Sequence, residues 1–289
     1  MWAKLSLAAN ILIVATGGAV RLTASGLGCP TWPLCTEDSL ISTPEMGVHG
    51  IIEFGNRLLT FLLAALALLA FLSVQHRRRE RPDLFWLALT VGIGIIVQAI
   101  VGGITVLLNL HPGAVGIHYM ISAALVSVAA TLVYRLTHPP GVRRQTTRTA
   151  AILTSCLLAA TVVTIYLGTL TTGAGPHAGD SAAARNGLDP GVLQHFHAVP
   201  GYVMLVLSLV LLGIAIRAPG HASHRRHLGW FVAIEAVQIA VGVAQARLGL
   251  PVILVGIHMV IACVLVMLLT WIMLATRQQA PTIEAGEPA

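Results

Sequence analysis

Long apolar stretches recur along this chain and are separated by shorter polar segments. A helix needs roughly 20 apolar residues to cross the hydrocarbon core of a bilayer, which is about 30 Å thick. Eight stretches are long enough, at about 5–22, 50–74, 84–108, 114–135, 149–170, 191–217, 228–248 and 252–276. The pattern therefore predicts an all-α integral membrane protein with eight transmembrane helices.

Composition supports this class. Of 289 residues, 56% are hydrophobic and only 10% are charged. A water-soluble globule of this size needs more polar side chains than that to cover its surface.

The net charge of +6 is explained by the positions of the basic side chains. Thirteen of the 17 Lys and Arg residues fall at one set of helix ends: Lys4, Arg77, Arg78, Arg79, Arg81, Arg135, Arg143, Arg144, Arg148, Arg217, Arg225, Arg226 and Arg277. By the positive-inside rule these ends are cytoplasmic, and eight spans place both termini in the cytoplasm. We expect a multi-pass protein of the cytoplasmic membrane and no nucleic-acid partner.

The second half of the chain repeats the first. Residues 114–121 and 254–261 share a Val-Gly-Ile-His core, with His118 and His258 140 positions apart. Gln98 in the preceding span matches Gln238 at the same offset.

The repeat extends to the second span of each half, where residues 53–56 fall on residues 194–197 at an offset of 141. A repeated unit of four helices predicts two pseudo-symmetric bundles, each able to hold its own ligand. We assign residues 1–140 to the first half and 141–289 to the second.

Three of the 12 histidines are the informative ones, each four to eight residues inside the outer end of its span: His118, His197 and His258. An imidazole in hydrocarbon needs a partner, and intramembrane ionisable groups are functional candidates by default, although hydrogen bonding between helices is the alternative. Histidines facing each other from two helices of a bundle are typical axial ligands of haem iron. We predict this role for His197 and His258. The histidines of the cytoplasmic segments, including His224 and His227, are expected to be solvated.

The first half lacks the matching pair, because Asn56 stands where His118 needs a partner. Asparagine does not normally ligate haem iron, so this site is five-coordinate, exchangeable or served by another histidine. His49 is the nearest candidate, on about the same helical face as Glu53 and Asn56 and about 10 Å further out.

Two acidic side chains lie inside spans. Glu53 either pairs with Arg57 one turn later or lies beside a substrate pocket, where it moves protons or stabilises positive charge. Gln194 at the matching position of the other half favours the second interpretation. Glu235 is expected to hydrogen-bond to Gln238 and has no assigned role.

The four cysteines fall into two groups. Cys29 and Cys35 share the first outer loop, where a disulfide is the default outside the cytoplasm and a redox-active one stays open. Two cysteines are too few ligands for a zinc site. Cys156 and Cys263 lie in apolar spans and are expected to be small core residues.

Residues 21–35, with Cys29-Pro30-Thr31-Trp32-Pro33-Leu34-Cys35 at their end, resemble the first outer loop of haem A synthases. Residues 52–57 and the single histidines of the fourth, sixth and eighth spans are similar to that family too. Residues 172–180 resemble its actinobacterial branch. The resemblance covers essentially the whole chain.

The resemblance implies an oxidoreductase that converts haem O to haem A, oxidising a porphyrin methyl to a formyl group by successive hydroxylations. It implies a permanent haem b on His197 and His258, on the outer side of the membrane. It also implies a substrate-haem site with His118 as axial ligand and Glu53 as the catalytic residue. Asn56, Arg57 and His49 are expected around that substrate haem, and Cys29–Cys35 corresponds to the family's outer disulfide.

This chain departs from the family at two places. Many members read Glu-x-x-His-Arg where this chain has Asn56 before Arg57, and some carry a second cysteine pair in the later outer loop, where this chain has His177 and Asp180. The implied partners are a haem O synthase, assembly factors of terminal oxidases and an unidentified electron donor or acceptor. A homo-oligomer stays open.

Two other functions compete. A dihaem b-type electron-transfer cytochrome requires two bis-imidazole sites, which Asn56 disfavours. A transporter also has internal repeats, but here the repeats run parallel and no broken helices are evident.

Overall fold

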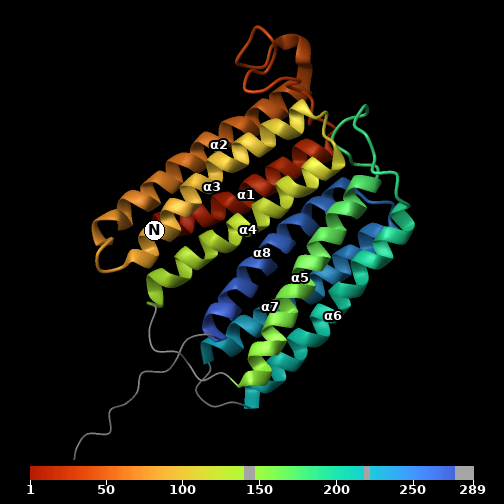
Figure 1. The fold of residues 1–289 in the computed structure, drawn as a ribbon. Helices are drawn as coiled ribbons and strands as arrows, with labels where there is room; N and C mark the ends of the chain where they lie inside the picture. Colours follow the sequence, from red (N-terminus) through yellow and green to blue (C-terminus); the bar gives the residue numbers. More distant parts are fainter. Residues whose placement is uncertain (140–146, 218–221, 277–289) are drawn as a thin grey trace, which may run out of the picture.

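The computed structural model describes residues 1–139, 147–217 and 222–276. Arg143, Arg144, Arg277 and the predicted boundary at residue 140 lie outside the described residues. The described part of the chain contains eight α-helices and no strand (Figure 1). They are α1 (Trp2–Leu22), α2 (Gly47–Val74), α3 (Pro82–Leu107), α4 (Pro112–Thr137), α5 (Arg148–Ala174), α6 (Pro190–Arg217), α7 (Ala222–Arg247) and α8 (Val252–Thr276).

All eight helices are long and apolar enough to cross a membrane, so the predicted spans are confirmed. Their ends differ from the prediction by up to six residues. Helix α7 begins at Ala222 instead of residue 228, and α5 continues to Ala174 instead of residue 170. An apolar pattern marks only the hydrocarbon-crossing part of a helix, whereas backbone hydrogen bonding continues into its polar ends.

The helices pack as two neighbouring groups of four, α1–α4 and α5–α8 (Figure 1). Helices α1 and α4 of the first group contact α8, and α4 also contacts α5. Trp271 on α8 donates a hydrogen bond of 3.0 Å from its indole nitrogen to the carbonyl of Ala130 on α4. The first group therefore meets the second along α1 and α4, although a division of roles at residue 140 stays a prediction.

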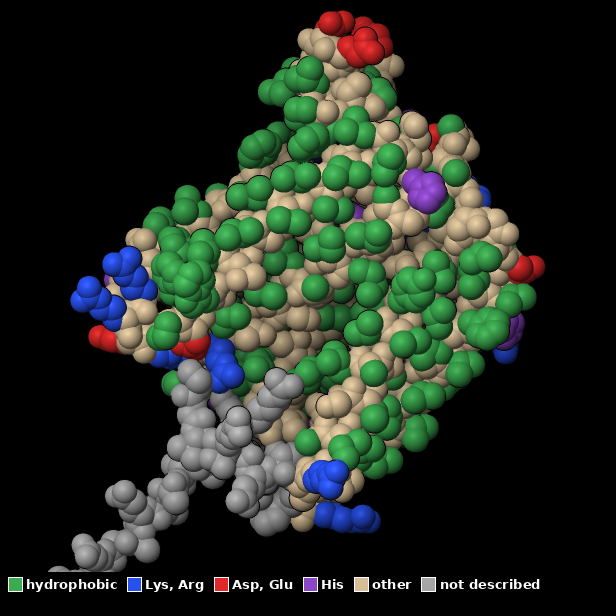
Figure 2. Space-filling view, in the orientation of Figure 1, with side chains coloured by type: hydrophobic (Ala, Val, Ile, Leu, Met, Phe, Trp, Pro, Cys, Tyr) green, Lys and Arg blue, Asp and Glu red, His purple; other side chains and the backbone are tan. Residues whose placement is uncertain are grey.

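Two long loops lie at the same end of the molecule, which we call the outer end. They are the first outer loop, residues 23–46, and the second outer loop, residues 175–189. Figure 2 shows a broad band of hydrophobic side chains, acidic side chains on the tip of the first outer loop, and basic side chains gathered toward the opposite end. This distribution is the one that the positive-inside rule describes.

Two expectations about individual side chains are wrong. His224 and His227 are buried, because α7 extends one and a half turns beyond its apolar stretch and carries them into the protein. The His227 ring lies between Trp271 and Tyr134, with ring centres 5.5 Å and 6.3 Å away. Cys263 is buried as expected, whereas Cys156 is exposed on α5. Lipid and protein core are both apolar, so hydropathy does not tell which face of a helix turns outward.

Candidate functional site

The clearest pair of candidate ligands lies in the second half. His197 on α6 and His258 on α8 face each other with ring centres 6.1 Å apart and planes inclined by 68°. The Nδ1 of His197 lies 2.9 Å from the Thr164 carbonyl oxygen, which only accepts, so Nδ1–H is the donor. In the neutral ring this leaves the Nε2 lone pair free for a metal.

The distance between these rings fits an iron atom held between them. With roughly 2 Å for each metal–nitrogen bond and about 1 Å from each nitrogen to its ring centre, a bis-imidazole metal needs ring centres about 6 Å apart. The 6.1 Å separation agrees with that value. On the other ring, the buried Nδ1 of His258 has no hydrogen-bond partner among the described residues.

Each intramembrane histidine packs against a glycine of a neighbouring helix. A methyl group added at Gly168 would lie 3.0 Å from Cε1 of His197, and one at Gly242 would lie 3.2 Å from Cε1 of His258. In the first half, a methyl group at Gly102 would lie 3.3 Å from Cε1 of His118. These glycines let an imidazole lie directly on helix backbone, so they set the positions of the rings. Sequence reasoning missed this role.

The two halves also share the hydrogen bond that holds the backbone at the histidine. Gln98 on α3 donates to the carbonyl of His118 at 3.1 Å, and Gln238 on α7 donates to the carbonyl of His258 at 3.0 Å. The side chain of Gln98 also bonds to Ser122. The predicted repeat is thus reproduced in three dimensions.

The first half has one imidazole where the second half has two. Asn56 on α2 points toward α1, with its Nδ2 3.8 Å from the place of a methyl group on Gly17. Its Oδ1 is buried without a hydrogen-bond partner in the described part of the chain, and the same holds for Nδ1 of His118. Unsatisfied polar atoms of this kind are costly to bury. The first site therefore presents polar atoms that lack a partner.

Glu53 is only 5% exposed and both of its carboxylate oxygens are engaged. Oε1 forms an ion pair with Nη2 of Arg57 at 2.6 Å, and Oε2 accepts a hydrogen bond of 2.6 Å from the backbone N–H of Cys29. The pairing with Arg57 that one interpretation expected is therefore present. The contact with Cys29, 24 positions away, could not be read from the sequence.

Arg57 extends this contact across the first outer loop. Its guanidinium donates to three backbone carbonyls of that loop, those of Cys29, Thr31 and Leu34, at 2.9–3.1 Å. The predicted disulfide Cys29–Cys35 is formed, and both cysteines are fully buried.

The loop also packs onto α3 through Trp32. A methyl group on Gly103 would lie 2.3 Å from the Trp32 ring, so only a glycine fits there. Gly103 directly follows Gly102, which contacts His118. The disulfide-closed loop, held by Glu53 and Arg57, therefore reaches the outer end of the helix that supports His118.

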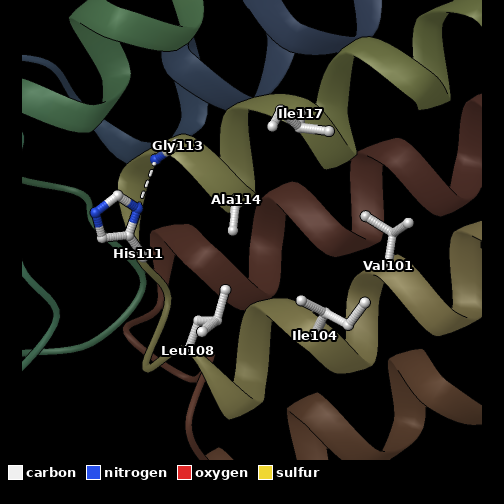
Figure 3. Close-up of a pocket in the computed structure, with 7 residues that line it drawn as sticks. All are labelled: Val101, Ile104, Leu108, His111, Gly113, Ala114 and Ile117. Atoms are coloured by element: carbon white, nitrogen blue, oxygen red, sulfur yellow. Dashed lines mark hydrogen bonds between the residues drawn. The ribbon is translucent and has the colours of Figure 1, made fainter.

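The other outer histidines lie at the periphery. His49 is exposed, and its Nδ1 is 2.9 Å from Oγ of Ser25. His111 caps the start of α4, where its Nδ1 accepts from the backbone N–H of Gly113 at 3.2 Å. It borders a groove of about 480 Å³ between α3 and α4, otherwise apolar, which neither His118 nor Glu53 lines (Figure 3).

Glu235 is 2% exposed, and its partner is not the expected Gln238. The hydroxyl of Ser208 on α6 donates to Oε2 of Glu235 at 2.8 Å, while Oε1 has no hydrogen-bond partner in the described part of the chain. The hydrogen bond to Glu235 therefore comes from α6 and not from its own helix, α7.

The fold and the site define a multi-pass helical membrane protein with an imidazole pair suited to an axially ligated metal. The family model of the COX15-CtaA cytochrome oxidase assembly proteins matches residues 1–271. The chain belongs to this family.

Named relatives are similar over a shorter stretch. A protein named "Heme A synthase" from Bacillus cereus (strain AH187) is 28% identical over 124 residues, which is 43% of this chain and 39% of the relative. One of the same name from Bacillus anthracis (strain A0248) is 29% identical over 122 residues, 42% of this chain and 38% of the relative. The matches thus cover less than half the length of these curated relatives.

Proposed function

We propose that this protein is a haem A synthase, which oxidises a methyl substituent of haem O to a formyl group through successive hydroxylations. Membership of the COX15-CtaA family and the names of the similar Bacillus proteins support the proposal. The observation that carries it is the contrast between the halves. The second has two imidazoles at metal-binding distance, and the first has one imidazole with a buried carboxylate nearby.

In this proposal His197 and His258 hold a permanent b-type haem, which supplies electron transfer when bound. The chain contributes rigid axial ligands: the Thr164 carbonyl fixes the tautomer of His197, and Gly168 and Gly242 fix the ring positions. Two histidine ligands would suit a haem that stores an electron, and they would leave the substrate chemistry to the first half.

The first half receives the substrate haem. His118 is its axial ligand, and Asn56, Arg57 and, more peripherally, His49 surround it. Because Asn56 does not replace an imidazole, one axial side stays exchangeable. This suits a haem that must enter as substrate and leave as product.

Glu53 serves as the catalytic carboxylate. A porphyrin methyl is unreactive, and its oxidation removes protons and electrons from the carbon. A carboxylate can accept a proton or balance positive charge, and both effects are stronger where water is excluded. Arg57 and the N–H of Cys29 hold the two oxygens in place, so the loop positions the acid as well as covering the site.

The proposal also includes the orientation of the protein in the membrane and its partners. The basic helix ends face the cytoplasm and the haem ligands lie toward the outer side of the cell membrane. A haem O synthase delivers the substrate, oxidase assembly factors take the product, and a redox partner exchanges electrons. The proposal also assigns the protein to the actinobacterial branch of the haem A synthases.

The test is co-expression with a haem O synthase in cells that otherwise make no haem A, followed by chromatography of the extracted haems. We expect haem A, with the hydroxymethyl form as intermediate. Protein that carries haem but never yields an oxidised haem O would instead be an electron-transfer cytochrome. The variant His118→Ala is the matched control, because it should abolish the product and keep the permanent haem.

A further inference from the structure

Arg21, at the outer end of α1, is a partly buried cation that forms no ion pair among the described residues. Its Nη2 donates to the carbonyl of Thr172 on α5 at 2.7 Å, and its Nε is buried with no hydrogen-bond partner among the described residues. Among the described residues, the arginines that form ion pairs are Arg57 and Arg81. Burying a charge is costly unless it is paired, so this guanidinium calls for an acidic partner.

The second outer loop covers Arg21 and adds positive charge. A methyl group on Gly179 would lie 3.5 Å from Cγ of Arg21, and Gly179 in turn accepts a hydrogen bond of 2.8 Å from the N–H of Gly26. Arg185 of the same loop brings a second positive charge close enough to repel that of Arg21. The two acids of this loop, Asp180 and Asp189, accept hydrogen bonds of 2.8 Å from the backbone N–H groups of Ala182 and Val192, and neither forms an ion pair within the described residues. The loop therefore covers the cation without neutralising it.

The position of Arg21 relates it to both candidate haem sites. One turn deeper on α1, a methyl group on Gly18 would lie 3.1 Å from Cε of Met259, the residue after His258. Gly17 faces Asn56 of the other site. With a rise of 1.5 Å per residue, Arg21 stands about 5–6 Å further out than this level. If a haem is held at the level of these contacts, Arg21 lies on its outer side.

We infer that Arg21 binds a propionate carboxylate of a haem, assisted by the positive field of Arg185. The planar guanidinium matches a carboxylate with two parallel hydrogen bonds, and its Nε is the donor that lacks an acceptor here. The ligand chemistry is a haem propionate, supplied by either the permanent or the substrate haem. The inference rests on the haem-binding part of the proposed function and not on methyl oxidation.

The experiment compares Arg21→Gln and Arg21→Lys with wild type. Protein from cells without haem O synthase gives the midpoint potential of the permanent haem by redox titration, and added haem O gives the affinity of the first site. Loss of the cation leaves a carboxylate uncompensated, which disfavours the extra electron. We expect Arg21→Gln either to lower the midpoint potential by about 59 mV, a tenfold change for one electron, or to raise the Kd for haem O about tenfold. Arg21→Lys should retain most of the wild-type value.

Arg247→Gln is the matched control. The substitution removes the same charge, and Arg247 is exposed at the outer end of α7. It should change neither quantity. A shift in the potential assigns the carboxylate to the permanent haem, and a shift in the Kd assigns it to the substrate haem. Unchanged values in purified Arg21→Gln and Arg21→Lys overturn the inference, even if less protein accumulates. Haem A formation is measured separately: its failure in wild type refutes the proposed function but leaves this result standing.

Discussion

Replacement of Glu53 by glutamine tests the catalytic proposal against a purely structural role. Glutamine keeps the shape, and its Oε1 can still accept the hydrogen bond from Cys29 N–H. The change removes the charge that pairs with Arg57 at 2.6 Å. Both roles therefore predict an effect, and the size and kind of the effect distinguish them.

The structural effect is bounded by the contacts of Arg57. Breaking a buried ion pair costs about 3–5 kcal/mol when the remaining charge has no other partner. Arg57 retains three backbone carbonyls, so we expect a smaller loss, about 2–3 kcal/mol. This should lower the amount of haem-loaded protein recovered from membranes. It should not change the turnover of the molecules that fold.

The catalytic effect is larger and appears per molecule. A positioned acid or base contributes about 10²- to 10⁴-fold to rate, so haem A formed per mole of permanent haem should fall at least about 100-fold in Glu53→Gln. Arg57→Lys is the control: it keeps a cation for Glu53 but cannot reach all three carbonyls. It should lower recovery more than it lowers turnover. A normal ratio of haem A to permanent haem in Glu53→Gln would end the catalytic interpretation.

Four further substitutions, one of them a control, test the ligand geometry. His258→Ala should remove the low-spin spectrum of the permanent haem, and its retention would refute the bis-imidazole assignment. Gly242→Ala places a methyl group 3.2 Å from Cε1 of His258 and should weaken binding of that haem about tenfold, since overpacking costs about 1–3 kcal/mol. Gly229→Ala on the same helix meets nothing within 4 Å and should bind normally; equal weakening would exclude the steric reason. Asn56→His should convert the spectrum of bound haem O to low spin, and an unchanged high-spin spectrum would show that position 56 does not face the iron.

The sequence predicted well what depends on local pattern. Eight spans follow from apolar length, and the pairing of Cys29 with Cys35 follows from two cysteines in one outer loop. The repeat predicted matching positions for His118 and His258, and equal spacing from Gln98 and Gln238 produces the same helix–helix contact in both halves. These features need no knowledge of how distant helices are rotated.

The sequence could not predict how each helix is rotated about its axis or which distant side chains meet. Ser208 bonds to Glu235 across two helices, and Cys29 reaches Glu53 only because the first outer loop folds back onto α2. The burial of His227 depends on Trp271 and Tyr134, which come from two other helices. In a bilayer, packing and polar contacts orient a helix, and these are not visible in its apolar pattern.

The first half has Asn56 where the second half has an imidazole. The backbone beside Asn56 nevertheless leaves room for an imidazole. Gly17 faces Asn56 as Gly168 faces His197, and the room beside it is larger, 3.8 Å against 3.0 Å. The backbone cradle for an imidazole is thus retained although the imidazole is not. This space agrees with the proposal that the first half also binds a haem. In the proposed function, a haem with one axial side free, next to the Glu53–Arg57 pair that the disulfide-closed loop holds, would be the one that is changed and released.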